Sequence, residues 1–93
     1  DVHAERATYP QRKERLMAEL REQAPTAIAG HDVVRSLELD TNDGFKWWTE
    51  DGSWLLVRFS GTEPLVRVYV EATGAERRDA MLAEGELLVR GES

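Results

Sequence analysis

Residues 45–59 read FKWWTEDGSWLLVRF and carry the clearest secondary-structure signal in the sequence. Two runs rich in aromatic and branched apolar side chains flank Asp51-Gly52, a dipeptide typical of tight β-hairpin turns because glycine accepts a positive φ. The stretch therefore predicts two antiparallel strands, over residues 45–49 and 53–59.

A further strand is predicted on each side of this hairpin. Residues 33–39 alternate between apolar and polar side chains in their second half and lead into Asn42-Asp43-Gly44, a turn signal. Residues 66–72 alternate strictly, which places every second side chain on the same face of a strand. We expect the core-facing set to be Val66, Val68 and Val70.

Helical spacing of apolar residues occurs near both ends of the chain. The pattern predicts a helix over residues 9–23, with Thr8 and Gln11 forming a capping box and Pro25 ending the helix. A second helix is predicted over residues 75–89. Its expected apolar face comprises Ala80, Met81, Leu87 and Leu88.

Together these elements predict an α+β domain of two layers, a mostly antiparallel four-stranded sheet with two helices able to cover one face. Residues 1–9 have no strong pattern, so we expect them to be a linker from an upstream domain. The chain does not begin with Met and is expected to be a piece of a larger protein.

The composition restricts the classes of function. The chain has 93 residues, a formal net charge of −6 and no cysteine. Its length fits one domain, and its acidic balance opposes non-specific binding to nucleic acids or anionic membranes. The lack of cysteine excludes disulfides, thiol catalysis and cysteine-based zinc sites. The lack of cysteine also fits a reducing compartment, so the cytoplasm is the expected location. No apolar run approaches the roughly 20 residues that span a bilayer.

The segment most informative about function is residues 58–67, RFSGTEPLVR. It carries Arg58, Glu63 and Arg67, a local charge of +1 in an acidic chain. Guanidinium groups meet phosphate oxygens in pairs, hydroxyls donate hydrogen bonds, and glycine lets the main chain come close to a ligand. The segment therefore predicts a cradle for a phosphate group, formed by Arg58, Ser60, Gly61, Thr62 and Arg67.

A purely structural interpretation of the same segment stays open at this point. Ser60 and Thr62 would cap their own backbone, as in an ordinary hairpin loop. Glu63 and Glu71 would pair with the two arginines and orient them. Residue types alone do not choose between a cradle and a structural loop.

Residues 58–71, RFSGTEPLVRVYVE, resemble the phosphate-binding loop of the α-D-phosphohexomutases, the phosphoglucomutase/phosphomannomutase superfamily. The similarity is unbroken and falls in the fourth and last domain of that family. It implies that residues 10–93 are this C-terminal phosphate-binding domain. It also implies a fold similar to that of the TATA-box-binding protein, as a matter of shape only.

The same resemblance implies a four-domain parent isomerase that interconverts hexose 1-phosphates and 6-phosphates of the glucose or mannose type. A phosphoserine in the first domain transfers the phosphoryl group, a Mg²⁺ loop in the second supports it, and a loop in the third reads the sugar. The fourth domain grips the phosphate that is not transferred, a role that falls on Arg58, Ser60, Gly61, Thr62 and Arg67. We therefore expect no catalytic residue and no cofactor here, with a phosphosugar and the other domains of the chain as partners, and neither nucleic acid nor membrane.

Two alternatives stay open beside this resemblance. Phosphoglucosamine mutase shares the Ser-Gly-Thr-Glu-Pro run, although Phe59 and Tyr69 favour the glucose or mannose branch. Tyr69 shares its strand face with Arg67 and could border a ligand. The other alternative is a free-standing phosphoanion-binding module without catalysis.

The remaining chemically distinctive side chains favour structural roles. His3 and His31 are far apart in sequence and have no patterned carboxylates, so we expect no metal site. Trp47, Trp48 and Trp54 could stack on a sugar ring, but aromatic side chains that flank a hairpin more often pack on the sheet or on a neighbouring domain.

Overall fold

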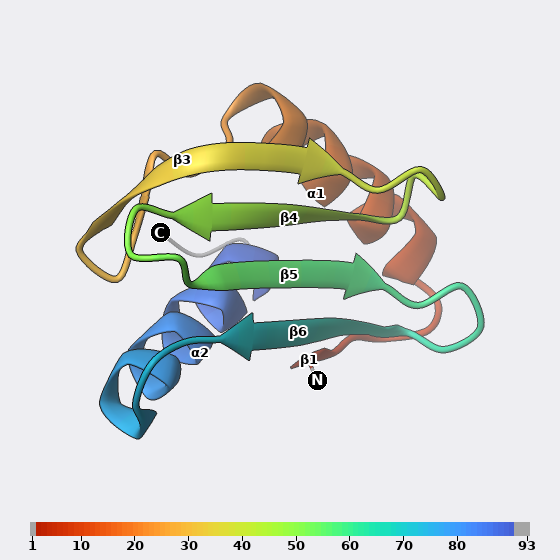
Figure 1. Ribbon diagram of the computed structural model, residues 1–93. Helices are drawn as coiled ribbons and strands as arrows, with labels where there is room; N and C mark the ends of the chain where they lie inside the picture. The colour runs from red at the N-terminus through yellow and green to blue at the C-terminus, as the bar shows by residue number, and fades with distance from the viewer. Residues whose placement is uncertain (1, 91–93) are drawn as a thin grey trace.

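The computed structural model describes residues 2–90, and Figure 1 shows two helices behind one antiparallel sheet. The elements are β1 (Val2–His3), α1 (Tyr9–Glu22), β2 (Ala27–Ile28), β3 (His31–Glu38), β4 (Gly44–Thr49), β5 (Trp54–Phe59), β6 (Leu65–Glu71) and α2 (Ala75–Arg90). The strand order is β1-β6-β5-β4-β3-β2, and every neighbouring pair is antiparallel. Among the described residues, neither helix is long and apolar enough to cross a membrane.

The sheet has six strands, whereas the sequence pattern predicts four. The two additional strands lie at the edges, where β1 pairs with β6 and β2 pairs with β3. Each has two residues, which is too few for a period-two pattern to be recognisable. The α+β class is confirmed, and the segment expected to act as a linker contains β1.

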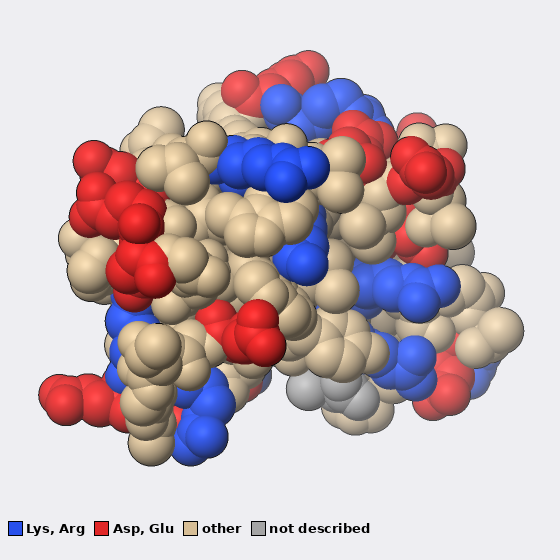
Figure 2. Space-filling view, viewed as in Figure 1, with Lys and Arg blue, Asp and Glu red and all other residues tan. Residues whose placement is uncertain are grey.

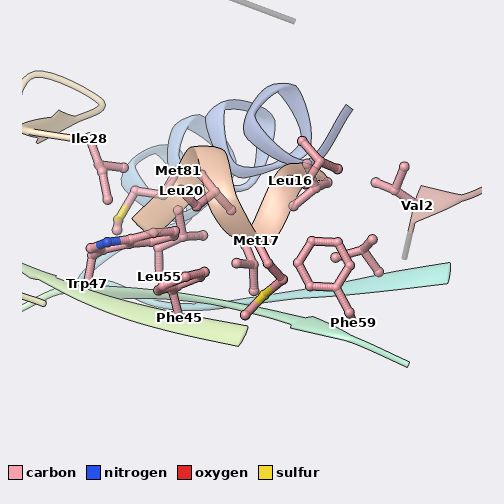
Figure 3. Close-up of a cluster of buried hydrophobic side chains, with 13 residues drawn as sticks. Val2, Leu16, Met17, Leu20, Ile28, Phe45, Trp47, Leu55, Phe59 and Met81 are labelled. Atoms are coloured by element: carbon pink, nitrogen blue, oxygen red, sulfur yellow. The ribbon is translucent and has the colours of Figure 1, made fainter. Parts of the chain in front are cut away.

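Both helices cover the same face of the sheet, and the core lies between these layers (Figure 3). Phe45 and Trp47 point into it from β4, with stacked rings whose centroids are 5.7 Å apart. From β6, Val66 is buried, and Val68 and Val70 pack against the core, as predicted. The largest fully buried side chains are Trp47, Phe59, Leu16, Ile28, Leu55 and Met81.

Helix α1 buries the predicted face but lacks the predicted cap. Leu16, Met17 and Leu20 lie in the core. Thr8 has helical backbone angles (φ −102°, ψ −7°), and its hydroxyl donates to the Glu5 carbonyl (3.4 Å) instead of capping the helix. A capping hydroxyl needs an extended backbone to reach the next turn, so the capping box does not form.

The buried face of α2 matches the predicted one in part, since Met81 is buried and Leu88 packs against the core. Met81, Gly85 and Val89 are buried at a spacing of four residues, while Ala80 is exposed and Leu87 is 47% exposed. The prediction grouped side chains seven residues apart and missed the position where the helix comes closest to the sheet. A Cβ at Gly85 would lie 2.8 and 2.9 Å from side-chain atoms of β5 and β6. The glycine thus sets the helix-to-sheet distance.

No helix of residues 2–90 covers the other face of the sheet, which is called the open face below. On it, Arg35 lies over the Trp48 ring (4.5 Å), and Lys46 lies over the rings of Trp48 (4.8 Å) and Trp54 (4.2 Å). Cation–π contacts at exposed sites contribute about 0.5–1 kcal/mol each. Trp47 is fully buried on the opposite face, so the three tryptophans divide between the core and the open face.

Arg77 ties α2 to two turns of the sheet. Its side chain donates to Asp51 Oδ2 (3.0 Å) and to the carbonyls of Ile28 (3.2 Å) and Ala29 (2.9 Å). Asp51 also accepts from the Thr49 hydroxyl (2.6 Å). Hydrogen bonds from Thr49 and then Arg77 hold the pKa of the Asp51 carboxyl well below its ordinary value of 3.8.

Unfolding measured against pH is expected to report this cluster. Because the folded-state pKa of Asp51 lies below its unfolded value, the unfolded chain binds the extra proton, and stability that is present above about pH 4 is lost as pH falls toward the folded pKa. We expect this group to account for on the order of 1 kcal/mol per pH unit there. Asp51→Asn should be less stable at neutral pH and lose less stability in acid. Denaturant titrations of both proteins measure this, and an equal acid loss would contradict it.

Candidate functional site

Two arginines face each other near one end of the β5–β6 pair. Arg58 and Arg67 are register partners, and both lie on the open face because Val57 and Phe59, on either side of Arg58, are buried in the core. Figure 2 looks onto this face and shows basic groups on its right-hand side. Like charges directly opposite on neighbouring strands destabilise a sheet by about 0.2–1 kcal/mol. Within residues 2–90 Arg67 makes no ion pair, so its charge is unbalanced.

The loop that joins these strands, residues 60–64, is organised around the hydroxyl of Ser60. This oxygen accepts hydrogen bonds from the backbone N–H groups of Thr62 (3.3 Å) and Glu63 (3.1 Å). The Ser60 amide donates to the Leu65 carbonyl (3.0 Å), which closes the loop. A hydroxyl has two acceptor positions and one donor. Ser60 therefore caps its own backbone, as the structural interpretation expects, and still has its O–H to donate.

Gly61 and Thr62 form the exposed tip of this loop. A Cβ added at Gly61 would meet no atom within 4 Å, and its φ is not among the positive values in the chain. Neither packing nor backbone conformation therefore requires glycine at this position. Within the described part of the chain the Gly61 N–H donates to no acceptor. The space beside Gly61 is open to a ligand.

Tyr9, the first residue of α1, holds the loop from the helix side. Its hydroxyl donates to the Ser60 carbonyl (2.6 Å) and the Leu65 carbonyl (3.1 Å), one at each end of the loop. Burial and the negative charge of Asp43 raise the pKa of Tyr9 above its ordinary value of 10.0, so the phenol remains a donor at neutral pH. No local pattern signals this role, because Tyr9 and Ser60 are 51 residues apart.

Removing the Tyr9 hydroxyl is expected to loosen the loop. Tyr9→Phe should lower the free energy of unfolding by about 1–2 kcal/mol, because one buried carbonyl loses its partner. Amide hydrogen exchange of residues 61–63 should accelerate, as measured by NMR. Tyr69→Phe is the matched control, since Tyr69 is 44% exposed and its hydroxyl makes no hydrogen bond within residues 2–90. Indistinguishable exchange rates in the two variants would contradict this role.

Asp43 is a site residue that the sequence pattern assigned only to a turn. Its Oδ2 lies 3.3 Å from Arg58 Nε, and its side chain is 16% exposed against 54% for Arg58. Burial opposes ionisation, but hydrogen bonds from Thr41 and Arg58 outweigh it and lower the pKa of the Asp43 carboxyl below its ordinary value. The carboxylate is therefore charged at neutral pH.

The two glutamates expected to orient the arginines do not do so. Glu71 accepts a hydrogen bond from Trp54 Nε1 (2.8 Å), and Glu63 forms no ion pair within residues 2–90. The expectation relied on proximity in sequence, whereas the β4–β5 pairing supplies Asp43 as the partner of Arg58.

The histidines lie away from each other, as their separation in sequence suggested. His3 is paired with Leu65 at the edge of the sheet, and His31 Nδ1 lies 3.4 Å from a carboxylate oxygen of Glu50.

A hollow of about 160 Å³ lies on the helix side of the same loop. It is lined by Arg6, Tyr9, Pro10 and residues 61–64. Arg6, which the sequence pattern did not single out, brings a further basic side chain to the loop. The hollow does not include the opposed arginines, so basic groups border the loop tip from two directions.

The five residues predicted to form the cradle thus belong to two strand ends and the loop between them. Two guanidinium groups supply positive charge, and the loop adds a hydroxyl donor and a backbone N–H. Groups of these kinds bind small dianions in proteins through charge-assisted hydrogen bonds.

The sequence matches the family profile described as phosphoglucomutase/phosphomannomutase, C-terminal domain, over residues 11–88. Since the match covers most of the chain, the protein belongs to this family of sugar-phosphate mutase domains. The matched range contains both arginines and the whole loop between them.

Several curated proteins carry related sequences. A phosphopentomutase of Thermococcus kodakarensis is 45% identical over 58 residues, which are 57% of this chain and 13% of that protein. A probable phosphoglucosamine mutase of Methanopyrus kandleri is 47% identical over 53 residues, 57% of this chain and 12% of that protein. A probable phosphomannomutase of Haemophilus influenzae is 37% identical over 82 residues, 82% of this chain and 17% of that protein. The chain therefore spans less than a fifth of the length of these relatives, whose names refer to different sugars.

Proposed function

We propose that this chain binds the non-transferred phosphate of a phosphosugar within a full-length phosphohexomutase. The binding residues in this proposal are Arg58, Ser60, Gly61, Thr62 and Arg67. The observation that carries the proposal is the opposed pair of arginines beside a loop with unused donors. Membership of the mutase family supports it.

Two cations face each other at the arginine pair, and within residues 2–90 only Arg58 has a carboxylate partner, Asp43. A phosphate monoester dianion placed between the two guanidinium groups would convert a cross-strand repulsion into two attractive contacts. The Ser60 O–H and the Gly61 N–H would supply further donors without breaking any hydrogen bond of the loop. The chain as a whole is acidic, with a net charge of −6, so it favours a compact anion over an extended polyanion.

The proposed phosphate site, called the clamp below, would contribute to catalysis by holding the substrate in a fixed position. Phosphoryl transfer depends chiefly on in-line alignment and charge stabilisation, and a group that fixes one end of the sugar controls where the other end lies. The substrate must present its 1-phosphate and its 6-phosphate in turn, so the clamp must accept both. Arginine and hydroxyl side chains suit this double role because they contact the phosphate and make few contacts with the sugar ring.

The chemistry of transfer belongs to other domains in this proposal. The phosphoserine and the Mg²⁺ that the family resemblance implies would be held there. Among residues 2–90 no group of three or more histidines and carboxylates is placed to hold a metal ion. The role proposed for this chain is to bind and orient the substrate, in a cytoplasmic enzyme.

The sugar is proposed to be a glucose or mannose phosphate. Of the two residues that favoured this branch, Phe59 is 1% exposed in the core and cannot contact a ligand, whereas Tyr69 is exposed beside Arg67. A glucosamine phosphate is the second candidate, favoured by the 47% identity to the Methanopyrus kandleri relative. The ratio of kcat/KM for glucose 1-phosphate and glucosamine 1-phosphate, measured on the full-length enzyme, decides between them.

The proposal is tested by an NMR titration of the 93-residue chain with glucose 6-phosphate. We expect saturable shifts of the amides of Ser60, Gly61 and Thr62, and no shift with glucose, which lacks the phosphate. Inorganic phosphate should reproduce the shifts, because the proposed site binds the phosphate group. Loop amides that remain unmoved by both phosphate compounds would refute the proposed function.

A further inference from the structure

Asp43 is held in place by both its side chain and its main chain. The side chain accepts hydrogen bonds from Thr41 Oγ1 and from Arg58 Nε, the latter at 3.3 Å. The Asp43 carbonyl accepts from the Phe59 amide (2.7 Å), which anchors the turn before β4 to the end of β5. The carboxylate is thus a fixed point beside an arginine that is otherwise half exposed.

The geometry of this contact leaves the phosphate-binding edge of Arg58 available. A guanidinium group is planar and has five N–H donors in a rigid fork. Asp43 engages Nε, and the two terminal nitrogens, with four donors, make no hydrogen bond within residues 2–90. Holding one edge of the plane fixes the direction of the other. An arginine restrained in this way loses less side-chain freedom when a ligand binds.

The groups around Asp43 also limit its repulsion of an anion. Arg58 and the positive charge of Lys13 both act on this carboxylate, and Thr41 donates to it. Tyr9 lies close enough for the charge of Asp43 to influence it. The negative charge is therefore surrounded by cations and donors.

We propose that Asp43 is a positioning residue that orients the Arg58 guanidinium for phosphate, and this inference rests on the proposed function above. For the removal of Asp43, this proposal predicts a change in phosphate affinity of opposite sign to that expected from charge repulsion alone. A carboxylate near an anion site repels the anion, so its removal would strengthen binding if charge were its only effect. If it positions Arg58, its removal weakens binding.

The experiment compares dissociation constants for glucose 6-phosphate in NMR titrations of the wild-type chain and three variants. Asp43→Ala removes charge and acceptor, and we expect binding to weaken by about five- to tenfold. Asp43→Asn keeps an oxygen acceptor for Nε without the charge, and we expect it to remain within about twofold of wild type. Asp40→Ala is the charge-matched control, because Asp40 is exposed in the same turn region and makes no ion pair with Arg58 within residues 2–90. It should bind at least as tightly as wild type.

A second measurement uses the wild-type chain alone and so does not depend on whether a variant folds. The Nε–H resonance of Arg58 in the wild-type chain should be slow to exchange with water and should persist during titration. That of Arg67, whose guanidinium group makes no hydrogen bond within residues 2–90, should not be protected before ligand is added. Protection absent at Arg58 would overturn the inference.

Failure of this inference is distinguishable from failure of the proposed function. Asp43→Ala binding as tightly as wild type, while Arg58→Ala binds much more weakly, would leave the phosphate site standing and remove the positioning role. Arg58→Ala binding as tightly as wild type would remove the proposed site itself.

Discussion

Arg58→Ala and Arg67→Ala are each expected to lower kcat/KM of the full-length mutase by about ten- to a hundredfold. Each variant removes a charge-assisted hydrogen bond to the phosphate, worth about 1.5–3 kcal/mol. Because this contact binds the ground state and also aligns the sugar for in-line transfer, which contributes more in the transition state, we expect KM to rise and kcat to fall. Steady-state kinetics with hexose 1-phosphate measures the effect.

In the Arg67→Ala variant, we expect the loss of activity to occur without a loss of stability. Arg58 and Arg67 are directly opposed like charges, so Arg67→Ala is expected to keep or slightly raise the free energy of unfolding while it lowers activity. Arg78→Ala is the matched control: this exposed arginine on α2 pairs with Asp79 and is not part of the site. Activity within twofold of wild type in both site variants would contradict the clamp.

Gly44→Ala is expected to lower the free energy of unfolding by about 3 kcal/mol or more. A Cβ at Gly44 would lie 2.2 Å from the Val57 carbonyl oxygen, a backbone atom that can move only if β4 and β5 separate. In a domain of this size the melting temperature should fall by more than about 10 °C. Thermal unfolding followed by circular dichroism measures this. The glycine is required here by close approach of two strands, since its φ is not positive.

Gly61→Ala is the matched control for this variant. Its added Cβ would meet no atom within 4 Å, so the melting temperature should stay close to that of wild type. Its phosphate binding should weaken, because the methyl group would occupy space that the ligand needs. Equal thermal stability of Gly44→Ala and wild type would contradict the strand packing described above.

The central hairpin was predictable because its signals are local and agree with one another. Gly52 has φ +87°, as an Asp-Gly turn requires, and the strands on either side alternate between core and open face. Pairing Trp48 with Trp54 and counting back in register places Gly44 opposite Arg58. The same count would have placed Asp43 beside the site, so this partner was within reach of the sequence pattern.

Other features depend on contacts that no local pattern encodes. Tyr9 reaches the loop across 51 residues, and the edge strands β1 and β2 are defined only by the partners they pair with. The buried face of α2 is set by Gly85, where the absence of a side chain allows close packing, and apolar periodicity does not register an absent side chain. The cradle residues are proposed from their chemistry, whereas the contact of Tyr9 with the loop is visible only in the tertiary structure.

A crystal structure of this chain with glucose 6-phosphate would show where the phosphate binds. We predict that the phosphate lies between the guanidinium groups of Arg58 and Arg67, with Ser60 Oγ and the Gly61 nitrogen within about 2.7–3.2 Å of its oxygens. A phosphate seated only in the hollow beside Arg6, with the two guanidinium groups turned away from each other and no anion between them, would contradict the account.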